Sequence, residues 1–372
     1  MTYSFKSGKI SPFWTTVTDV RYSSFIWRRR TKPITSAQTL VIPSGPLKVR
    51  NYTPTPDRNI GMELIRVSEA AALGAVRWFG LGDKIGADQA AVDAMNAMLA
   101  TVDMDGIVRI GEGEKDEAPM LFNGQVVGNG NGPKMDVAVD PVDGTTILSE
   151  GREGSIAVIA AAPGGTMIDV RDFFYLDKIV VGKEAKGKID ITAPVAWNIE
   201  QVAKALDIPV NSVVVTILKR DRNNEIIKAV RAAGARINLI GDGDIAGALV
   251  ACMPGTGAHM LLGSGGSPEA VTAACGIIAL RGDMQCRPFI SRDEERRAIL
   301  EKGIDPNRVM NLDDLVSSQD TYFAATGVTN GTMLQGIQPL AHGVTVSHSV
   351  VMRGLTGTIR RIETEHNWDR DN

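Results

Sequence analysis

The sequence is poor in the residues that build disulfide frameworks and zinc sites. Its 372 residues include only three cysteines, Cys252, Cys275 and Cys286, and no two of them form a CxxC pair. None of its four histidines pairs with another at metal-ligand spacing. Three thiols are too few for a disulfide framework, and this usage is typical of reduced cysteines in a cytoplasmic compartment.

Long apolar runs are missing as well. The chain has no stretch of about 18 or more apolar residues, so we expect no membrane-spanning helix. It also lacks the apolar stretch of a secretory signal. The hydrophobic content of 44% is enough for a sizeable core, and a chain of this length is expected to form two domains.

The net charge of −3 conceals an uneven distribution of charge along the chain. Residues 1–56 contain nine Lys or Arg and a single acid, Asp19, which gives +8, whereas the rest of the chain carries 31 basic and 42 acidic residues, or −11. An acidic body argues against a nucleic-acid groove. An anionic ligand would need local arginines or bound cations to overcome the overall field.

The first 56 residues differ from the rest in composition. They are rich in Ser, Thr, Arg and Pro and show no sustained helical or strand period. This composition superficially resembles an organelle transit peptide, and the alternatives are a disordered tail or a start codon assigned too far upstream. We expect this basic extension to be dispensable for function.

The folded body is expected to begin near Asp57. Apolar residues between 62 and 79 recur at helical spacing, a second helix is predicted over 88–101, and buried strands are predicted over 106–111, 136–140 and 155–162. From about residue 199, strands over 212–218, 236–241 and 258–263 alternate with helices over 199–206, 224–233 and 245–252. This alternation predicts a mainly parallel sheet with ligand groups at the carboxyl ends of its strands. We therefore expect one domain over 57–198 and a second over 199–372.

Five acids stand out because each follows a predicted strand or lies in a loop broken by glycines. Carboxylates clustered at strand ends repel one another unless cations are present. Oxygen ligands without nearby Cys or His suit Mg²⁺ or Mn²⁺ better than zinc. The five candidates are Asp88, Glu112, Asp140, Asp143 and Glu269.

The run DPVDGT at 140–145 carries the strongest signal. Its proline stiffens a turn that can direct Asp140 and Asp143 into one space, and Gly144 allows the backbone to approach a ligand closely. The Thr145 hydroxyl could bind a metal or a water, and a helix opening after it would offer N–H groups to a phosphate. Asp88 could also act as a helix N-cap, which is the commoner role for such a residue.

Polar residues at later strand ends suggest how a sugar phosphate could be held. Asp242, Gly243 and Asp244 end the strand over 236–241 and could bind sugar hydroxyls, although a plain turn between strand and helix is an alternative. Arg220 and Arg222 follow another strand, and arginine forks suit phosphate oxygens; the alternative is a solvated basic loop. Tyr175 could line a pocket or donate its hydroxyl, while an aromatic residue in such a run is more often part of a core.

Taken together, these segments resemble class II fructose-1,6-bisphosphatases, the bacterial-type branch of the lithium-sensitive phosphatase superfamily. The resemblance runs from about residue 56 to 365, and the order and spacing of its segments are specific to the class. The segments are GDKIGAD (82–88), IGEGEKDEAPML (110–121), VDPVDGT (139–145), LIGDGDIAG (239–247), GSGGSPE (263–269), FAATGVTNG (323–331) and TGTIRRIETEH (356–366).

The resemblance implies an α/β fold that forms a five-layer α/β/α/β/α sandwich of two domains. It implies that the five acids are metal ligands and that Thr145 and Glu112 help to position the attacking water. By position, it also implies a set of residues that contact the sugar and phosphates. These are Asp143, Gly144, Thr145, Tyr175, Arg220, Arg222, Asp242, Gly243, Asp244 and Gly266.

The resemblance further implies hydrolysis of the 1-phosphate of fructose 1,6-bisphosphate, a step of gluconeogenesis, by a homo-oligomer such as a dimer or tetramer. Sedoheptulose 1,7-bisphosphate is the runner-up, alone or as a second substrate. An inositol-type monophosphatase and an inactive sugar-phosphate sensor are further alternatives. The sequence departs from the family pattern at Ile85, at Asp221 and Asn223, and at Ala270, and these changes bear on substrate preference.

Overall fold

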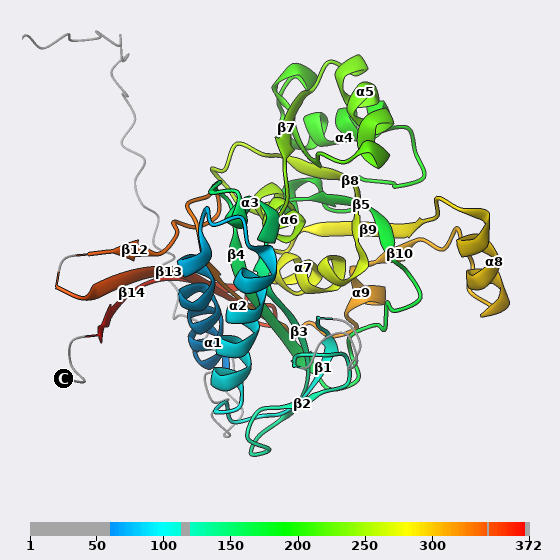
Figure 1. Cartoon of the computed structure of the whole chain (residues 1–372). Coiled ribbons are helices and arrows are strands. Elements are labelled where there is room, and N and C mark those ends of the chain that lie inside the picture. The colour runs from blue at the N-terminus through cyan, green and yellow to red at the C-terminus, as the bar shows by residue number, and fades with distance from the viewer. Residues whose placement is uncertain (1–59, 113–119, 341, 369–372) are drawn as a thin grey trace, which may run out of the picture. The chain divides into compact units, whose positions relative to one another are not determined.

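The fold is known from a computed structural model that describes residues 60–112, 120–340 and 342–368. The basic extension over 1–56 and most of the charged loop after Glu112 lie outside these residues. Within them, the chain forms two β-sheets with helices packed against them (Figure 1). This confirms the predicted α/β class, and the five-layer count stays a prediction. No helix in the described part is both long enough and apolar enough to cross a bilayer.

The first sheet has eight strands, and β14 forms its outer edge beside β13. Only β1 and β3 are parallel, and the other pairs are antiparallel. The strands are β1 (Asp105–Ile110), β2 (Val126–Val127), β3 (Lys134–Asp143), β4 (Ile156–Pro163), β11 (Tyr322–Gly327), β12 (Gln338–Pro339), β13 (Val344–Arg353) and β14 (Thr358–Asn367).

The second sheet has six strands in the order β10-β9-β5-β8-β6-β7. The three strands predicted over 212–263 are parallel to one another, as expected. The prediction of a mainly parallel sheet is wrong for the sheet as a whole, because its other three pairings are antiparallel. Strand β5 comes from the earlier part of the chain and inserts antiparallel between β8 and β9. The strands are β5 (Tyr175–Val181), β6 (Val214–Leu218), β7 (Arg236–Ile240), β8 (Met260–Gly266), β9 (Asp283–Phe289) and β10 (Met310–Asn311).

The helices cover both sheets. Most of those predicted from the sequence are present within a few residues of their expected ends, although the first helix stops at Ala75 and leaves Phe79 exposed. The helices are α1 (Ile60–Ala75), α2 (Lys84–Leu99), α3 (Thr145–Ser149), α4 (Val195–Leu206), α5 (Asn224–Ala232), α6 (Asp244–Cys252), α7 (Ser267–Leu280), α8 (Asp293–Glu301) and α9 (Leu312–Leu315).

Strand alternation divides the apolar side chains among three cores. On β3, Val137 and Val139 face a core shared with α1 and α2, whereas Ala138 between them faces the core that contains α6 and α7. The opposite face of the second sheet packs against α4 and α5. This period of two residues is the physical reason why each strand can serve helices on both sides.

Each sheet contains strands from both the earlier and the later part of the sequence. Strand β5 lies before residue 198 but belongs to the second sheet, and β11–β14 lie after residue 199 but belong to the first sheet. The domain boundary at 198 and 199 stays a prediction. What positions the candidate site is that β3, β6, β7 and β8 all end beside one cavity.

Candidate active site

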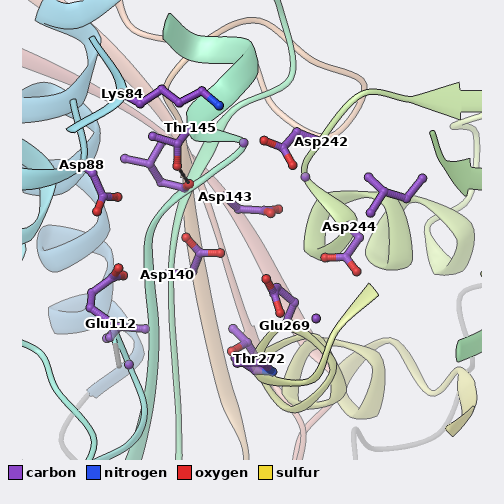
Figure 2. Close-up of a pocket in the computed structure, with 18 of the residues that line it drawn as sticks. Lys84, Asp88, Glu112, Asp140, Asp143, Thr145, Asp242, Asp244, Glu269 and Thr272 are labelled. Carbon is purple, nitrogen blue, oxygen red and sulfur yellow. Dashed lines mark hydrogen bonds between the residues drawn. The ribbon is translucent and has the colours of Figure 1, made fainter. Parts of the chain in front are cut away.

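The structure brings every predicted site residue to one cavity of about 570 Å³ (Figure 2). Its volume lies within the roughly 300–1,000 Å³ of small-molecule sites. The residues come from α2, from the ends of six strands and from the starts of α6 and α7. The predicted site residues that line the cavity are Asp88, Glu112, Asp140, Asp143, Gly144, Thr145, Tyr175, Arg220, Arg222, Asp242, Gly243, Asp244, Gly266 and Glu269.

A β-bulge explains how Asp140 and Asp143 reach the same cavity. Side chains three residues apart on a regular strand point to opposite faces. Here, Asp140 pairs with Val158 and Asp143 pairs with Ile156, so three steps along β3 match two steps along β4. The extra residue turns both carboxylates to the same side, as bulges beside functional sites commonly do.

Asp88 enters the cavity from within α2. The N-cap of this helix is Asp83, whose side chain accepts a hydrogen bond from the backbone N–H of Gly86 at 2.8 Å. The N-cap role considered for Asp88 is therefore wrong. Because Asp88 is not required for capping, its carboxylate is available to the cavity.

Glu112 and Glu269 complete the carboxylate set. Glu112 directly follows β1, where its backbone N–H donates to the carbonyl of Leu121 at 3.0 Å. Glu269 lies in the first turn of α7 and folds back over Gly266, where an added Cβ would collide with its Oε2. A side chain at position 266 would displace the Glu269 carboxylate from this position.

Burial and mutual repulsion disfavour the charged forms of these acids. Burial, together with the charges of Asp88 and Glu269, raises the pKa of Glu112 to about 8. Burial, followed by the charge of Asp143, raises the pKa of Asp140 well above its ordinary value, and burial followed by Asp244 does the same for Asp143. Such clustered carboxylates need a cation to ionise together at neutral pH.

The donor set fits a hard divalent cation. It consists of carboxylate oxygens without sulfur or imidazole, which suits Mg²⁺ or Mn²⁺. Within the described residues, Oε2 of Glu269 is buried without a hydrogen-bond partner. Buried polar atoms are usually satisfied, so this oxygen fits the role of a cation ligand. In the same part of the chain, no three acidic, Cys or His side chains already surround a single point, so the carboxylates line the cavity rather than forming a closed cage.

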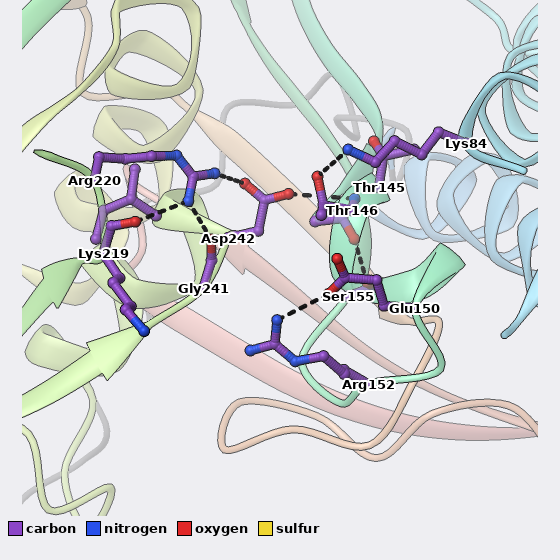
Figure 3. Close-up of polar contacts among 12 residues, drawn as sticks. Lys84, Thr145, Thr146, Glu150, Arg152, Ser155, Lys219, Arg220, Gly241 and Asp242 are labelled. Atoms are coloured by element: carbon purple, nitrogen blue, oxygen red, sulfur yellow. Dashed lines mark hydrogen bonds and ion pairs between the residues drawn. The ribbon is translucent and has the colours of Figure 1, made fainter. Parts of the chain in front are cut away.

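The turn after β7 crosses the cavity at Asp242 and Gly243. Arg220 Nη2 donates to Oδ1 of Asp242 at 2.9 Å, while Oδ2 of Asp242 accepts from the backbone N–H of Thr146 at 3.3 Å (Figure 3). Gly243 has a φ of 80°, a left-handed conformation that favours glycine. The ion pair and the turn together fix Asp242 between the two strand-end loops.

At Thr145, the group available to a ligand is the side-chain hydroxyl, because the helix that follows is short. Its hydroxyl donates to the carbonyl of Val142 at 3.0 Å, which leaves its lone pairs free to accept from a water. The helix expected after it is α3, which has only five residues. Asp242 already accepts from the Thr146 N–H, and the phosphate contact expected at the start of this helix stays a prediction.

Tyr175 and Arg222 form the wall of the cavity at the second sheet. The guanidinium carbon of Arg222 lies 4.0 Å from the centre of the Tyr175 ring, and Arg222 Nε donates to the carbonyl of Ser264 at 3.0 Å. Tyr175 is 38% exposed, so it lines the pocket and is not a core residue. Arg222 keeps the terminal nitrogens of its guanidinium for a ligand, since the ring and the carbonyl hold its position.

Two lysines escaped the sequence reasoning. Lys84 lines the cavity and donates from Nζ to Oγ1 of Thr146 at 2.8 Å. Lys178, on β5, is buried, and its Nζ lies 2.7 Å from Oδ2 of Asp244. Lys84 stands in the segment GDKIGAD, so its position among site residues was a usable signal, whereas nothing local to Lys178 indicates its distant partner.

A two-sheet α/β fold whose strand ends deliver a cluster of carboxylates and two arginines to one cavity is typical of metal-dependent phosphatases. The chain belongs to the family of bacterial fructose-1,6-bisphosphatases, since residues 58–366 match the model of the family described as bacterial fructose-1,6-bisphosphatase, glpX-encoded. This confirms the family predicted from the motifs.

Individual relatives agree with this assignment. The chain is 41% identical over 326 residues to fructose-1,6-bisphosphatase 1 class 2 of Escherichia coli strain K12, which covers 84% of this chain and 96% of that protein. The same values hold for the class 2 fructose-1,6-bisphosphatases of Escherichia coli O6:H1 and Shigella flexneri.

Proposed function

We propose that this chain is an enzyme that hydrolyses the 1-phosphate of fructose 1,6-bisphosphate to give fructose 6-phosphate and inorganic phosphate. The observation that carries this proposal is the convergence of five carboxylates with Arg220 and Arg222 on one cavity. The acids can hold cations beside one phosphate, and the arginines can bind a second phosphate. A bisphosphate has one phosphate for the cations and one for the arginines.

We assign the metal-binding role to Asp88, Glu112, Asp140, Asp143 and Glu269. Their oxygens would hold Mg²⁺ or Mn²⁺, which supplies charge neutralisation for the phosphate and lowers the pKa of a bound water. Without a cation, the raised pKa values of Glu112, Asp140 and Asp143 mean that protons take its place.

Thr145 and Glu112 would orient the attacking water. The Thr145 hydroxyl already donates its hydrogen bond to the Val142 carbonyl. Toward a water, the hydroxyl oxygen can therefore act only as an acceptor. Glu112 is the second acceptor when ionised. Two fixed acceptors restrict the water to one orientation, and phosphoryl transfer depends mainly on such positioning and on charge stabilisation.

The sugar and the distal phosphate would lie along the loops of the second sheet. Asp242, Gly243 and Asp244 would accept from sugar hydroxyls, and Gly144 and Gly266 would let the backbone approach the ligand. Arg220 and Arg222, the latter against the Tyr175 ring, would bind the phosphate that does not react. Ile85, which departs from the family pattern and is 83% exposed, also lines the cavity and is placed to influence substrate preference.

Release of phosphate from a panel of substrates tests this function. We expect purified enzyme with Mn²⁺ or Mg²⁺ to act on fructose 1,6-bisphosphate with kcat/KM at least about tenfold above that for inositol 1-phosphate, because the monophosphate lacks the group that Arg220 and Arg222 bind. Excess EDTA should abolish turnover, and added metal should restore it.

Other outcomes separate the alternatives. Faster turnover of sedoheptulose 1,7-bisphosphate would move the substrate to the longer sugar while keeping the mechanism. Tight binding of sugar bisphosphates without turnover at any metal concentration would contradict the proposal and favour a sensor.

A further inference from the structure

Leu121 has a backbone conformation that is unusual for a residue with a side chain. Its φ is 56°, in the left-handed region that favours glycine, yet its side chain is fully buried in the core shared with α1 and α2. A Cβ disfavours this conformation, which persists only where neighbouring contacts hold it. Residues of this kind gather at functional sites, so the contacts of Leu121 indicate what its conformation serves.

The carbonyl of Leu121 fixes the backbone of Glu112. It accepts the hydrogen bond from the Glu112 N–H at 3.0 Å. Gly111, the residue before Glu112, makes this close approach possible, because an added Cβ there would collide with the Leu121 carbonyl. The conformation of Leu121 therefore sets the point from which the Glu112 side chain enters the cavity.

Gln125 holds Leu121 and connects it to α2. Its Oε1 accepts a hydrogen bond from the Leu121 N–H, and its Nε2 donates to Oδ1 of Asn96 at 2.8 Å. Asn96 in turn donates from Nδ2 to Sδ of Met120 at 3.2 Å. A single amide thus ties the segment that fixes Glu112 to a helix of the first sheet's core.

The amide clamp, by which we mean the contacts of Gln125 with Leu121 and Asn96, joins the segments of two candidate cation ligands. Asp88 lies about two turns before Asn96 on α2. Figure 2 shows Asp88 and Glu112 on one side of the cavity. Their charges repel each other, so a link between the two segments is needed to keep both carboxylates in place.

We propose that Gln125 is a positioning residue of the metal site, which sets the place of Glu112 relative to Asp88. It acts through Leu121 and Asn96, since in the described part of the chain Gln125 itself does not line the cavity. Partners of this kind restrict a ligand to the geometry that the cation needs. The inference rests on the proposed function, because it takes Glu112 and Asp88 to be cation ligands.

Binding of Mn²⁺ alone to the metal-free full-length protein tests the proposal without turnover. Gln125→Met keeps the length of the side chain and removes both hydrogen bonds of the amide. Isothermal titration calorimetry should show that the affinity for Mn²⁺ falls by about tenfold or more, as is usual when a group that orients a metal ligand is lost. Gln319→Met is the matched control, because its amide contacts Asp313 outside the cavity, and it should bind Mn²⁺ as the wild type does.

Gln125→Glu separates positioning from the filling of space. It keeps the oxygen that accepts from the Leu121 N–H, and Asn96 can turn its amide to donate to the new carboxylate. This variant should recover most of the affinity that Gln125→Met loses. Asn96→Leu breaks only the link to α2 and should also weaken Mn²⁺ binding, which provides a second test if Gln125→Met does not fold. Circular dichroism shows which variants are folded.

Glu112→Ala is the reference that separates this inference from the proposed function. We expect it to lose affinity for Mn²⁺; if it binds Mn²⁺ as the wild type does, the ligand role of Glu112 fails and the inference fails with it. If Glu112→Ala loses affinity while folded Gln125→Met and Asn96→Leu keep it, the inference alone is overturned. A lower melting temperature of Gln125→Met in EDTA with unchanged affinity for Mn²⁺ would also overturn it, because the amide clamp would then serve the fold and not the metal site.

Discussion

Glu112 faces Asp88 and Glu269 in the cavity, and its pKa is raised to about 8 from an ordinary 4.5. An acid whose folded-state pKa is raised stays protonated in the folded protein at pH values where the unfolded chain already releases its proton. Its contribution to stability is thus fully present below about pH 4.5 and is lost as the pH rises to about 8. Each pKa unit is worth about 1.4 kcal/mol, so the effect on the metal-free protein is large.

Glu112→Gln should therefore raise the melting temperature of the metal-free protein at pH 8.5 and change it little at pH 4.5. Thermal unfolding in EDTA at both pH values measures this difference. Saturating Mn²⁺ should reverse the order at pH 8.5, because the wild-type protein alone keeps the full ligand set. The exposed Glu225→Gln on α5 is the control. A variant that is no more stable than wild type at pH 8.5 in EDTA would show that the ionised Glu112 carboxylate does not destabilise the metal-free fold.

Among the elements, those fixed by local sequence were predictable, and those fixed by distant partners were not. The strand before DPVDGT and the helices over 199–252 follow from short-range periodicity. The bulge in β3 depends on the register with β4, and the place of β5 depends on β8 and β9, from nearly one hundred residues later in the chain. Within each sheet, the gathering of site residues was predictable because parallel strands end together at one edge. That strand ends of both sheets meet at one cavity depends on how the two sheets pack, which local sequence does not encode.

The link between β5 and α6 is an example of a contact that local sequence does not encode. Lys178 on β5 and Asp244 at the start of α6 are 3% and 8% exposed and form an ion pair at 2.7 Å. Burial alone would lower the pKa of Lys178, but the charges of Asp244 and Glu269 outweigh it, and the pKa is raised. The lysine therefore remains charged and holds the Asp244 carboxylate between the two elements.

Lys178→Met should destabilise the protein by about 3–5 kcal/mol, because it leaves Asp244 buried without its counter-charge. Urea unfolding followed by circular dichroism measures the loss. The double variant K178M/D244N should regain part of it, since the unpaired charge is then removed. Lys228→Met in the exposed Lys228–Glu225 pair on α5 is the matched control and should cost less than about 0.5 kcal/mol. Equal effects of the two lysine changes would show that the buried pair has no special role.

At the scale of the whole molecule, the described residues that form the cores and line the cavity all lie after Pro56. The chain divides into two units, residues 1–56 and residues 57–372. Among the residues that the structure describes, those that line the cavity lie between Lys84 and Thr272. The composition that set the basic extension apart in the sequence thus coincides with the boundary of the folded unit.

We therefore expect a chain that begins at Asp57 to fold and to keep the turnover number of the full-length protein. It retains the whole of α1, in which Ile60, Leu64 and Ile65 are buried in the core with the first sheet. A chain that begins at Arg66 is the matched contrast, because it loses these three side chains and, at about 1.5–3 kcal/mol for each buried apolar residue, most of the margin of a typical domain. Soluble yield, thermal unfolding and phosphate release compare the two with the full-length protein. Loss of solubility or turnover on removal of 1–56 alone would show that the extension takes part in folding or catalysis. Equal behaviour of the two shortened chains would show that the start of α1 contributes less than its burial indicates.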